Sequence, residues 1–521
     1  MTTMPLTSSR ELAIWRSFIV LLVTATAYDV LFWQQDIGVN LPIFSVLIAG
    51  ALIGRYGWQN LGTRARALLA GLAIACFFTL WHNSVVAIIA GFVLLFLFTA
   101  FAHEPELKSI WYAIAQSIGN FFMTPVGASG AIGEALENKR VPRTGWRWFK
   151  LAMIPIVLLV VYFQIYRIAN PKFDELTAGF LGRIANWLGD FFEGILTAHT
   201  LFFLFAMMLS AGLLFRFAPR WLVNHEQQWS ELLLRQRMKR AHWLLPLHMN
   251  ALESERKVGL ILLVLMNLLL VVVNAVDIKW IWFGFTVPEG FSLKQFVHEG
   301  TWLLIISILL SIAILLRLFK GNQNFYTRSK PMRALAYAWI SQNFILGISV
   351  FLRNYHYIDF HGLAYKRIGV IVFLALVLVG LVTLYLKIRD RRSFYHLLRV
   401  NAWAAFVMLV LLTTINWDGL ITRYNLGHWN QGEIDVDNYL AMSDKVLPLL
   451  YADKEKVEEQ MKKHSFNEVV WISRTSMDQF APDLDGKRRA FLARWEKTGW
   501  QGWNRADANT YEVLKRMESA N

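Results

Sequence analysis

Histidines beside carboxylates are the first residues in this sequence whose types could bind a metal. His298 and Glu299 are adjacent, but they lack the His-Glu-x-x-His spacing that places two imidazoles on one face of a helix. His356 and His361 are five residues apart, a separation at which side chains on a helix diverge. The spacing therefore predicts no metal site, and His298 and Glu299 remain candidate polar residues at a helix end.

A second polar group, Arg423-Tyr424-Asn425, follows the last apolar stretch of the sequence. Arg423 could pair with a loop carboxylate and Asn425 could cap the next helical turn, so a structural role is the simpler interpretation. Arg367 opens another apolar stretch. With Glu299 and Arg423 it could line one pocket whose charges compensate each other.

Asp29 lies inside the first apolar stretch, toward the end that finishes at Gln34. A carboxylate within a membrane is costly, so such a residue is a candidate for proton or ion coupling by default. The alternative is a hydrated or paired residue at the membrane interface, and both interpretations stay open. No nucleotide-binding, dinucleotide-binding or serine-hydrolase motif is present, so we expect no cofactor. Enzymatic activity stays open, but a non-enzymatic role is preferred.

Membrane-spanning helices must position these side chains, because 56% of the residues are hydrophobic and they cluster in long stretches. A helix needs about 20 mostly apolar residues to cross a bilayer. The sequence predicts an all-α polytopic protein with about eleven transmembrane helices, near Ile14–Gln34, Leu41–Gly54, Ala67–Trp81, Val85–Phe101, Trp148–Tyr166, Thr200–Phe217, Val258–Val276, Trp302–Leu318, Ala334–Leu352, Ile368–Leu386 and Ala402–Ile415.

The basic residues between these stretches fall in alternate gaps. Five gaps hold 26 Lys and Arg residues and the opposing gaps hold eight. Because positive charge near helix ends stays cytoplasmic, the N-terminus is predicted to lie inside and the C-terminal tail outside. The segment 109–125 is apolar but contains Gln116 and Asn120. If it crossed the membrane, every later loop would lie on the opposite side from the one that its charge predicts. It is therefore predicted to be interfacial or re-entrant.

Two further regions are expected to lie at the membrane surface. Residues 173–195 place apolar side chains on one helical face, which predicts an amphipathic helix on the outer leaflet. The basic loop 216–257 is the largest cytoplasmic piece, and its Trp229–Trp243 portion is predicted to be a helix that attracts anionic lipid headgroups. Membrane lipids are thus expected partners, with other envelope proteins as a second class.

The sequence divides into a transmembrane domain, residues 1–417, and an extracytoplasmic helical tail, residues 418–521. The tail carries 15 Lys and Arg against 17 Asp and Glu, so the net charge of +15 comes from the membrane part and reflects topology. It therefore gives no reason to expect nucleic acid binding. At the N-terminus, an apolar segment followed by Ala25-Thr26-Ala27 is compatible with a cleaved signal peptide, but continued apolarity through Trp33 favours an uncleaved anchor.

The run Asn416–Leu426 (NWDGLITRYNL), followed by Asp437–Leu450, resembles the closing motif of bacterial membrane proteins in domain-of-unknown-function group 4173, which is related to group 4153. The pieces His298-Glu299-Gly300 and Gly362–Arg367 resemble that family's helix-opening elements, with Ala364 where Thr is usual. The similarity covers roughly Lys279 to Leu450, and the tail continues about seventy residues beyond the motif. The resemblance implies a multi-pass protein of the cell inner (cytoplasmic) membrane with unassigned activity.

Three classes of function remain open. A scaffold or a signalling or assembly partner that links the cell envelope to the cytoplasmic face requires no site that the sequence lacks, so it is preferred. A solute transporter or channel has the number of spans in its favour, but no repeated halves are visible. An intramembrane enzyme acting on lipid or envelope substrate would use the polar residues of the outer face, although no catalytic constellation is recognisable.

Overall fold

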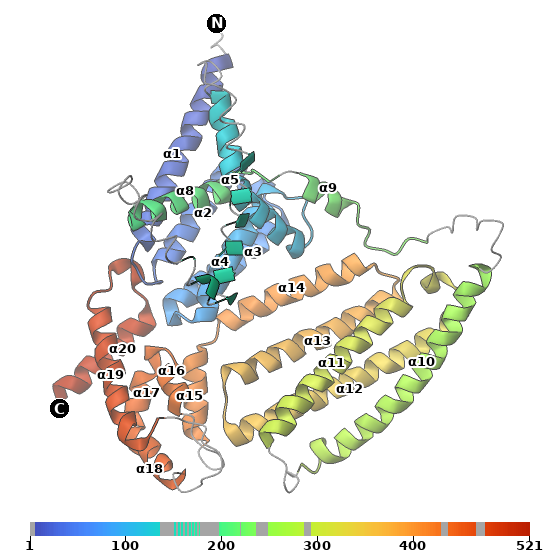
Figure 1. The fold of residues 1–521 in the computed structure, drawn as a ribbon. Helices are drawn as coiled ribbons and strands as arrows, with labels where there is room; N and C mark the ends of the chain where they lie inside the picture. The colour runs from blue at the N-terminus through green and yellow to red at the C-terminus, as the bar shows by residue number, and fades with distance from the viewer. Residues whose placement is uncertain are drawn as a thin grey trace.

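The computed structural model describes residues 6–135, 197–218, 220–235, 248–285, 293–428, 436–464 and 475–520, with short pieces between 151 and 177. In this part the chain is helical, and its only extended pairing is one bridge between Leu232 and Arg392. The helices form an N-terminal bundle, a second bundle and a C-terminal domain (Figure 1).

The N-terminal bundle is built on a core of large side chains such as Phe44, Leu68 and Phe98, which are fully buried. Its helices are α1 (Leu6–Phe32), α2 (Asn40–Tyr56), α3 (Thr63–His82), α4 (Val85–His103), α5 (Ile110–Ala135) and α8 (Ala198–Leu214), followed by the short α9 (Trp221–Gln227). Asn83, at a positive φ of 45°, turns the chain between α3 and α4, and Ser84 caps α4 by accepting a hydrogen bond from Ala87 N.

The second bundle is held by apolar packing and by amide side chains between α10 and α12. Asn267 donates to Leu335 O at 3.1 Å and accepts from Gln342 Nε2 at 2.7 Å. The helices are α10 (His248–Asp277), continued by a π-helical turn (Ile278–Trp282), α11 (Leu293–Leu318), α12 (Lys330–His361), α13 (Tyr365–Arg389) and α14 (Phe394–Thr413). α14 packs against both bundles, through Ala402 on the first and Leu397 on the second.

The C-terminal domain has a core of its own, centred on Val446, Leu450, Phe480 and Leu514. It contains α15 (Trp417–Gly427), α16 (Val436–Ala441), the 3₁₀ turn η5 (Asp444–Val446), α17 (Leu447–Ala452), α18 (Lys454–His464), α19 (Met477–Trp495) and α20 (Arg505–Ala520). A capping box of Ser476 and Gln479 opens α19.

Seven of the described helices are long and apolar enough to cross a membrane, and α2, α8 and the Ser17–Phe32 part of α1 are shorter apolar helices. These ten helices coincide with ten of the eleven spans predicted from the sequence. The predicted span Trp148–Tyr166 is described only in short helical pieces, so the count of eleven stays a prediction. The predicted amphipathic helix 173–195 lies almost entirely outside the described residues.

Two segments between spans have an unexpected form. Segment 109–125 belongs to the continuous helix α5, which is not among the seven long apolar helices. Its Asn120 side chain binds the end of α8, donating to Phe215 O and accepting from Phe217 N and Ala218 N. The predicted helix Trp229–Trp243 is wrong for residues 229–235. Leu233 N donates to Arg391 O there, and the chain runs extended along the α13–α14 turn.

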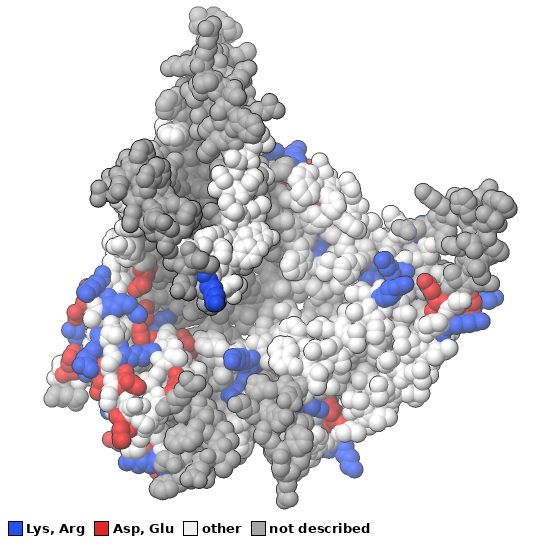
Figure 2. Space-filling model, viewed as in Figure 1, with Lys and Arg blue, Asp and Glu red and all other residues white. Residues whose placement is uncertain are grey.

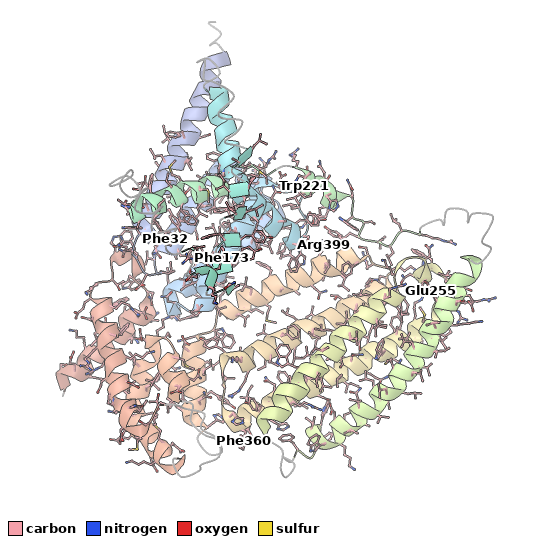
Figure 3. The ribbon with its side chains drawn as sticks, in the orientation of Figure 1. Phe32, Phe173, Trp221, Glu255, Phe360 and Arg399 are labelled. Atoms are coloured by element: carbon pink, nitrogen blue, oxygen red, sulfur yellow. The ribbon has the colours of Figure 1, made fainter. Side chains whose placement is uncertain are left out.

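The loops separate onto two opposite ends of the helices. The C-terminal domain contacts loops 33–39, 83–84 and 362–364, which are the gaps poor in basic residues. Three of the gaps rich in basic residues meet at the other end, where Leu233 N donates to Arg391 O and Lys387 Nζ donates to Phe319 O. Figure 3 shows Glu255 and Arg399 toward this end and Phe360 toward the end that carries the C-terminal domain. Which end faces the cytoplasm stays a prediction.

Candidate functional site

The C-terminal domain is fixed to the helix ends by three separate loops. Val39 N donates to Trp503 O at 3.0 Å, and Lys445 Nζ donates to Asn83 O. Gly38 lies so close to the backbone of residues 502 and 503 that a Cβ atom would overlap it, so the approach requires glycine. The C-terminal domain thus packs directly against the ends of the helices.

A cavity of about 560 Å³ lies where the C-terminal domain meets the ends of α3 and α14. Four segments that are far apart in sequence line it: the last turn of α3, the start of α15, the η5–α17 junction and the first turns of α20. A volume of this size lies in the range of sites for small ligands.

Three cationic side chains line the cavity, namely Arg423, Lys445 and Arg505. The guanidinium of Arg505 lies 3.7 Å from the centre of the Trp81 ring, a cation–π contact that holds it in place. Burial lowers the pKa of the Lys445 ammonium, although three carboxylates in its surroundings oppose this shift. Lys445 is therefore partly desolvated, whereas Arg423 and Arg505 have exposed side chains at the cavity.

The carboxylates around the cavity are bound to other residues. Asp444 pairs with Arg494 at 2.7 Å and with Lys487 at 3.5 Å. Asp418 accepts hydrogen bonds from Tyr365 at 2.6 Å and from Ser443. Among the described lining residues there is no Asp or Glu. The three carboxylates that act on Lys445, namely Asp507, Asp418 and Asp444, do not belong to the lining.

The structure places Arg423 on this cavity, with an exposed side chain and no ion pair to a described carboxylate. Asn425 does not cap the next turn. Its side chain accepts from Leu363 N at 2.5 Å and donates to Leu363 O at 2.8 Å, so it ties α15 to the α12–α13 loop. Tyr424 stacks on His428 with the ring centres 4.1 Å apart.

Arg367 lies away from the cavity lining and holds the α12–α13 turn. Its guanidinium donates to His361 O and to Gly362 O, and it lies 4.6 Å from the centre of the Tyr357 ring. His298 and Glu299 belong to α11, and their side chains lie outside the described part. Of the residues expected to share one pocket, Arg423 alone is brought to the cavity among the side chains that the structure describes.

Asp29 is paired across the N-terminal bundle. His199 Nε2, on α8, lies 2.8 Å from Asp29 Oδ2 and 3.0 Å from Oδ1, and the Asp29 side chain is 15% exposed. His199 in turn stacks on Trp33 with the ring centres 4.5 Å apart. The arrangement is that of a paired residue near the end of α1.

Sequence reasoning missed the other cavity residues and one buried ion pair. Lys445, Arg505 and Trp81 carry no motif, and only the fold brings them together. Arg353 on α12 and Asp277 on α10 pair at 2.6 Å, with side chains 9% and 5% exposed. The sequence signal is that Asp277 and Arg353 each border an apolar span.

Among the described residues, no three His, Cys, Asp or Glu side chains are grouped so that they could hold a metal ion. Compared with known proteins, the chain matches a family model described as "Domain of unknown function (DUF4153)" over residues 18–452. The chain belongs to this family. No curated protein and no solved structure matches it.

Membership in DUF4153 confirms the expected relation to group 4153 and extends it. The resemblance at Lys279–Leu450 covered α11–α14 and most of α15–α17, whereas the family model also covers α10 and the N-terminal bundle. The match ends at the end of α17, so Trp81, Arg423 and Lys445 lie inside the family region and Arg505 lies beyond it.

Proposed function

We propose that this DUF4153 protein is a multi-pass scaffold, or signalling or assembly partner, of the bacterial inner membrane, which links the cell envelope to the cytoplasmic face. The observation that carries the proposal is the attachment of the C-terminal domain to the helix ends through several loops. Three loops from both bundles bind it through backbone groups, at Val39, Asn83 and Leu363. A scaffold needs such an attachment, because partner binding on the domain can then bias the positions of the helices.

The opposite end of the bundles has a comparable structured platform. Glu226 is 1% exposed and accepts hydrogen bonds from Lys108 N, Ser109 N and Tyr395 Oη at 2.8–2.9 Å. Glu231 pairs with His396 and with Arg399 on α14. Loop 220–235 is thereby held against both bundles, which supports a second surface for partner binding.

The distribution of charge also supports the proposal. Figure 2 shows Lys and Arg interspersed with Asp and Glu over the C-terminal domain, and a largely uncharged surface over the α10–α13 bundle. Mixed charge is typical of a surface in water, whereas the uncharged band suits contact with lipid. Exposed Trp500 on the domain and exposed Trp229 on the opposite platform are the aromatic side chains that a partner could bury.

The experiment places a photoreactive phenylalanine analogue at Trp500, at Trp229 or at Leu269 of the full chain in living cells. Leu269, on α10, is exposed over the uncharged band and serves as the matched control. The proposal predicts discrete protein cross-links from positions 500 and 229, and none from position 269. Absence of protein cross-links from both aromatic positions, with normal membrane insertion, would refute a scaffold role.

A solute transporter is the second candidate, and the Asp29–His199 and Asp277–Arg353 pairs favour it, because charged residues inside a membrane often serve ion coupling. Asp29→Asn and the wild type are reconstituted in liposomes under a pH gradient, and lumenal pH is followed while candidate solutes are added. A solute-dependent proton flux that the variant loses would favour transport over scaffolding. Equal traces with full stability and cellular function in the variant would remove Asp29 as a coupling site.

A further inference from the structure

We propose that the cavity beneath the C-terminal domain binds the phosphate group of an anionic phospholipid from the leaflet on that side. The assignment does not depend on the scaffold role, since a transporter or an enzyme could hold the same lipid. It is carried by three features of the cavity: its charge, its apolar floor and its position at the end of a span.

The charge of the cavity calls for an anion. Arg423, Lys445 and Arg505 line one space of about 560 Å³. The nearby Asp418, Asp444 and Asp507 bind other side chains, and Asp507 accepts from Asn504 Nδ2 at 2.7 Å. Arg423 and Arg505 have exposed side chains without an ion pair to a described carboxylate, so their guanidinium groups can take an anion at the cavity. Arginine in particular suits phosphate, because its planar fork of N–H donors matches two phosphate oxygens.

The floor of the cavity is apolar and belongs to a membrane helix. Phe78 and Trp81 lie in the last turns of α3, a helix long and apolar enough to span. Trp81 is 47% exposed, and Phe77, which stacks on it, is 52% exposed. A Trp at the end of a span marks the headgroup level of the bilayer. A lipid phosphate at the cations would thus have its acyl chains along the exposed side of α3.

These features distinguish a lipid from a soluble anion. A soluble phosphate would use the cations but leave Phe77 and Trp81 exposed to solvent, whereas a phospholipid satisfies both parts of the site. Asn416 and Asn509 also line the cavity and supply amide groups for hydrogen bonds to headgroup or glycerol oxygens. The Arg505–Trp81 contact keeps the guanidinium at the boundary between the two parts.

The test measures lipid binding to the purified full chain by native mass spectrometry in detergent. The protein is titrated with phosphatidylglycerol or with zwitterionic phosphatidylcholine. The variants are Arg423→Gln, Arg505→Gln and the double change. Arg516→Gln, an exposed position near the other end of α20, is the matched control. Thermal unfolding of each variant checks that the fold is retained, and Arg423→Lys tests whether a positive charge restores binding.

We expect one phosphatidylglycerol to bind the wild type and Arg516→Gln more tightly than phosphatidylcholine does. The double variant should lose about tenfold or more in affinity, because two charge-assisted contacts are removed. Equal binding of both lipids, or unchanged binding by a folded double variant, would overturn the proposal. Displacement of the lipid by inorganic phosphate at matching concentration would overturn the lipid assignment and leave a soluble phosphate as the ligand.

Discussion

Asn425 offers a direct probe of how firmly the C-terminal domain is attached. Asn425→Ala removes two hydrogen bonds to the backbone of Leu363, at 2.5 and 2.8 Å. A hydrogen bond contributes a net ~0.5–1.5 kcal/mol, so the change should cost about 1–3 kcal/mol of docking free energy. That amount corresponds to an increase of about 5- to 150-fold in the local opening equilibrium.

Hydrogen–deuterium exchange of the detergent-solubilised protein measures this opening. Peptides from α15 and from residues 362–364 should exchange faster in Asn425→Ala, while peptides from α19 keep their protection because the core of the domain is intact. Arg516→Ala, an exposed position on α20 away from the cavity, is the control and should leave all peptides unchanged. Unchanged exchange in α15 of the Asn425 variant would show that other contacts carry the docking.

Three more predictions concern buried charges. Glu226→Gln should lower the free energy of unfolding in denaturant by about 1.5–3 kcal/mol, because the neutral amide keeps only one acceptor oxygen for three donors; an unchanged midpoint would contradict this. Asp277→Asn and Arg353→Met should each cost about 3–5 kcal/mol in the same assay, and the double variant less than their sum; additive costs would mean that the pair is uncoupled. Burial raises the pKa of the Glu104 carboxyl above its ordinary 4.5, despite the nearby Arg216. The folded state therefore holds that proton more tightly than the unfolded state does. As pH rises through the folded pKa, the free energy of unfolding of the wild type should fall relative to that of Glu104→Gln. Melting temperatures of the two proteins that change in parallel with pH would refute this prediction.

The helices were predictable because apolar stretches mark the part of each helix that must leave water. Several helices extend further than that signal. α10 begins at His248 rather than Val258, and polar contacts support its first turns, where Glu253 pairs with Arg256 and accepts from Tyr326. Hydropathy does not detect such turns, because they are stabilised by charge pairing and not by burial.

The cavity could not be predicted, because its lining comes from segments that only the tertiary fold brings together. Arg423 was a candidate on local sequence, but nothing near residues 445 or 505 indicated that they share its surroundings. Asn425 was expected to cap a turn, since side-chain amides commonly do so, whereas its partner is a loop sixty-two residues earlier in the chain. Local rules thus identified polar residues of interest but not their partners.

The central claim is that the C-terminal domain and the basic loop 216–257 lie on opposite sides of the membrane. Ser519→Cys and Ser254→Cys, both at exposed positions, are labelled in intact cells with a membrane-impermeant maleimide, against the buried native Cys76 as background. The account predicts that Ser519→Cys reacts in intact cells and that Ser254→Cys reacts only after permeabilisation. Equal labelling of the two positions under both conditions would contradict it.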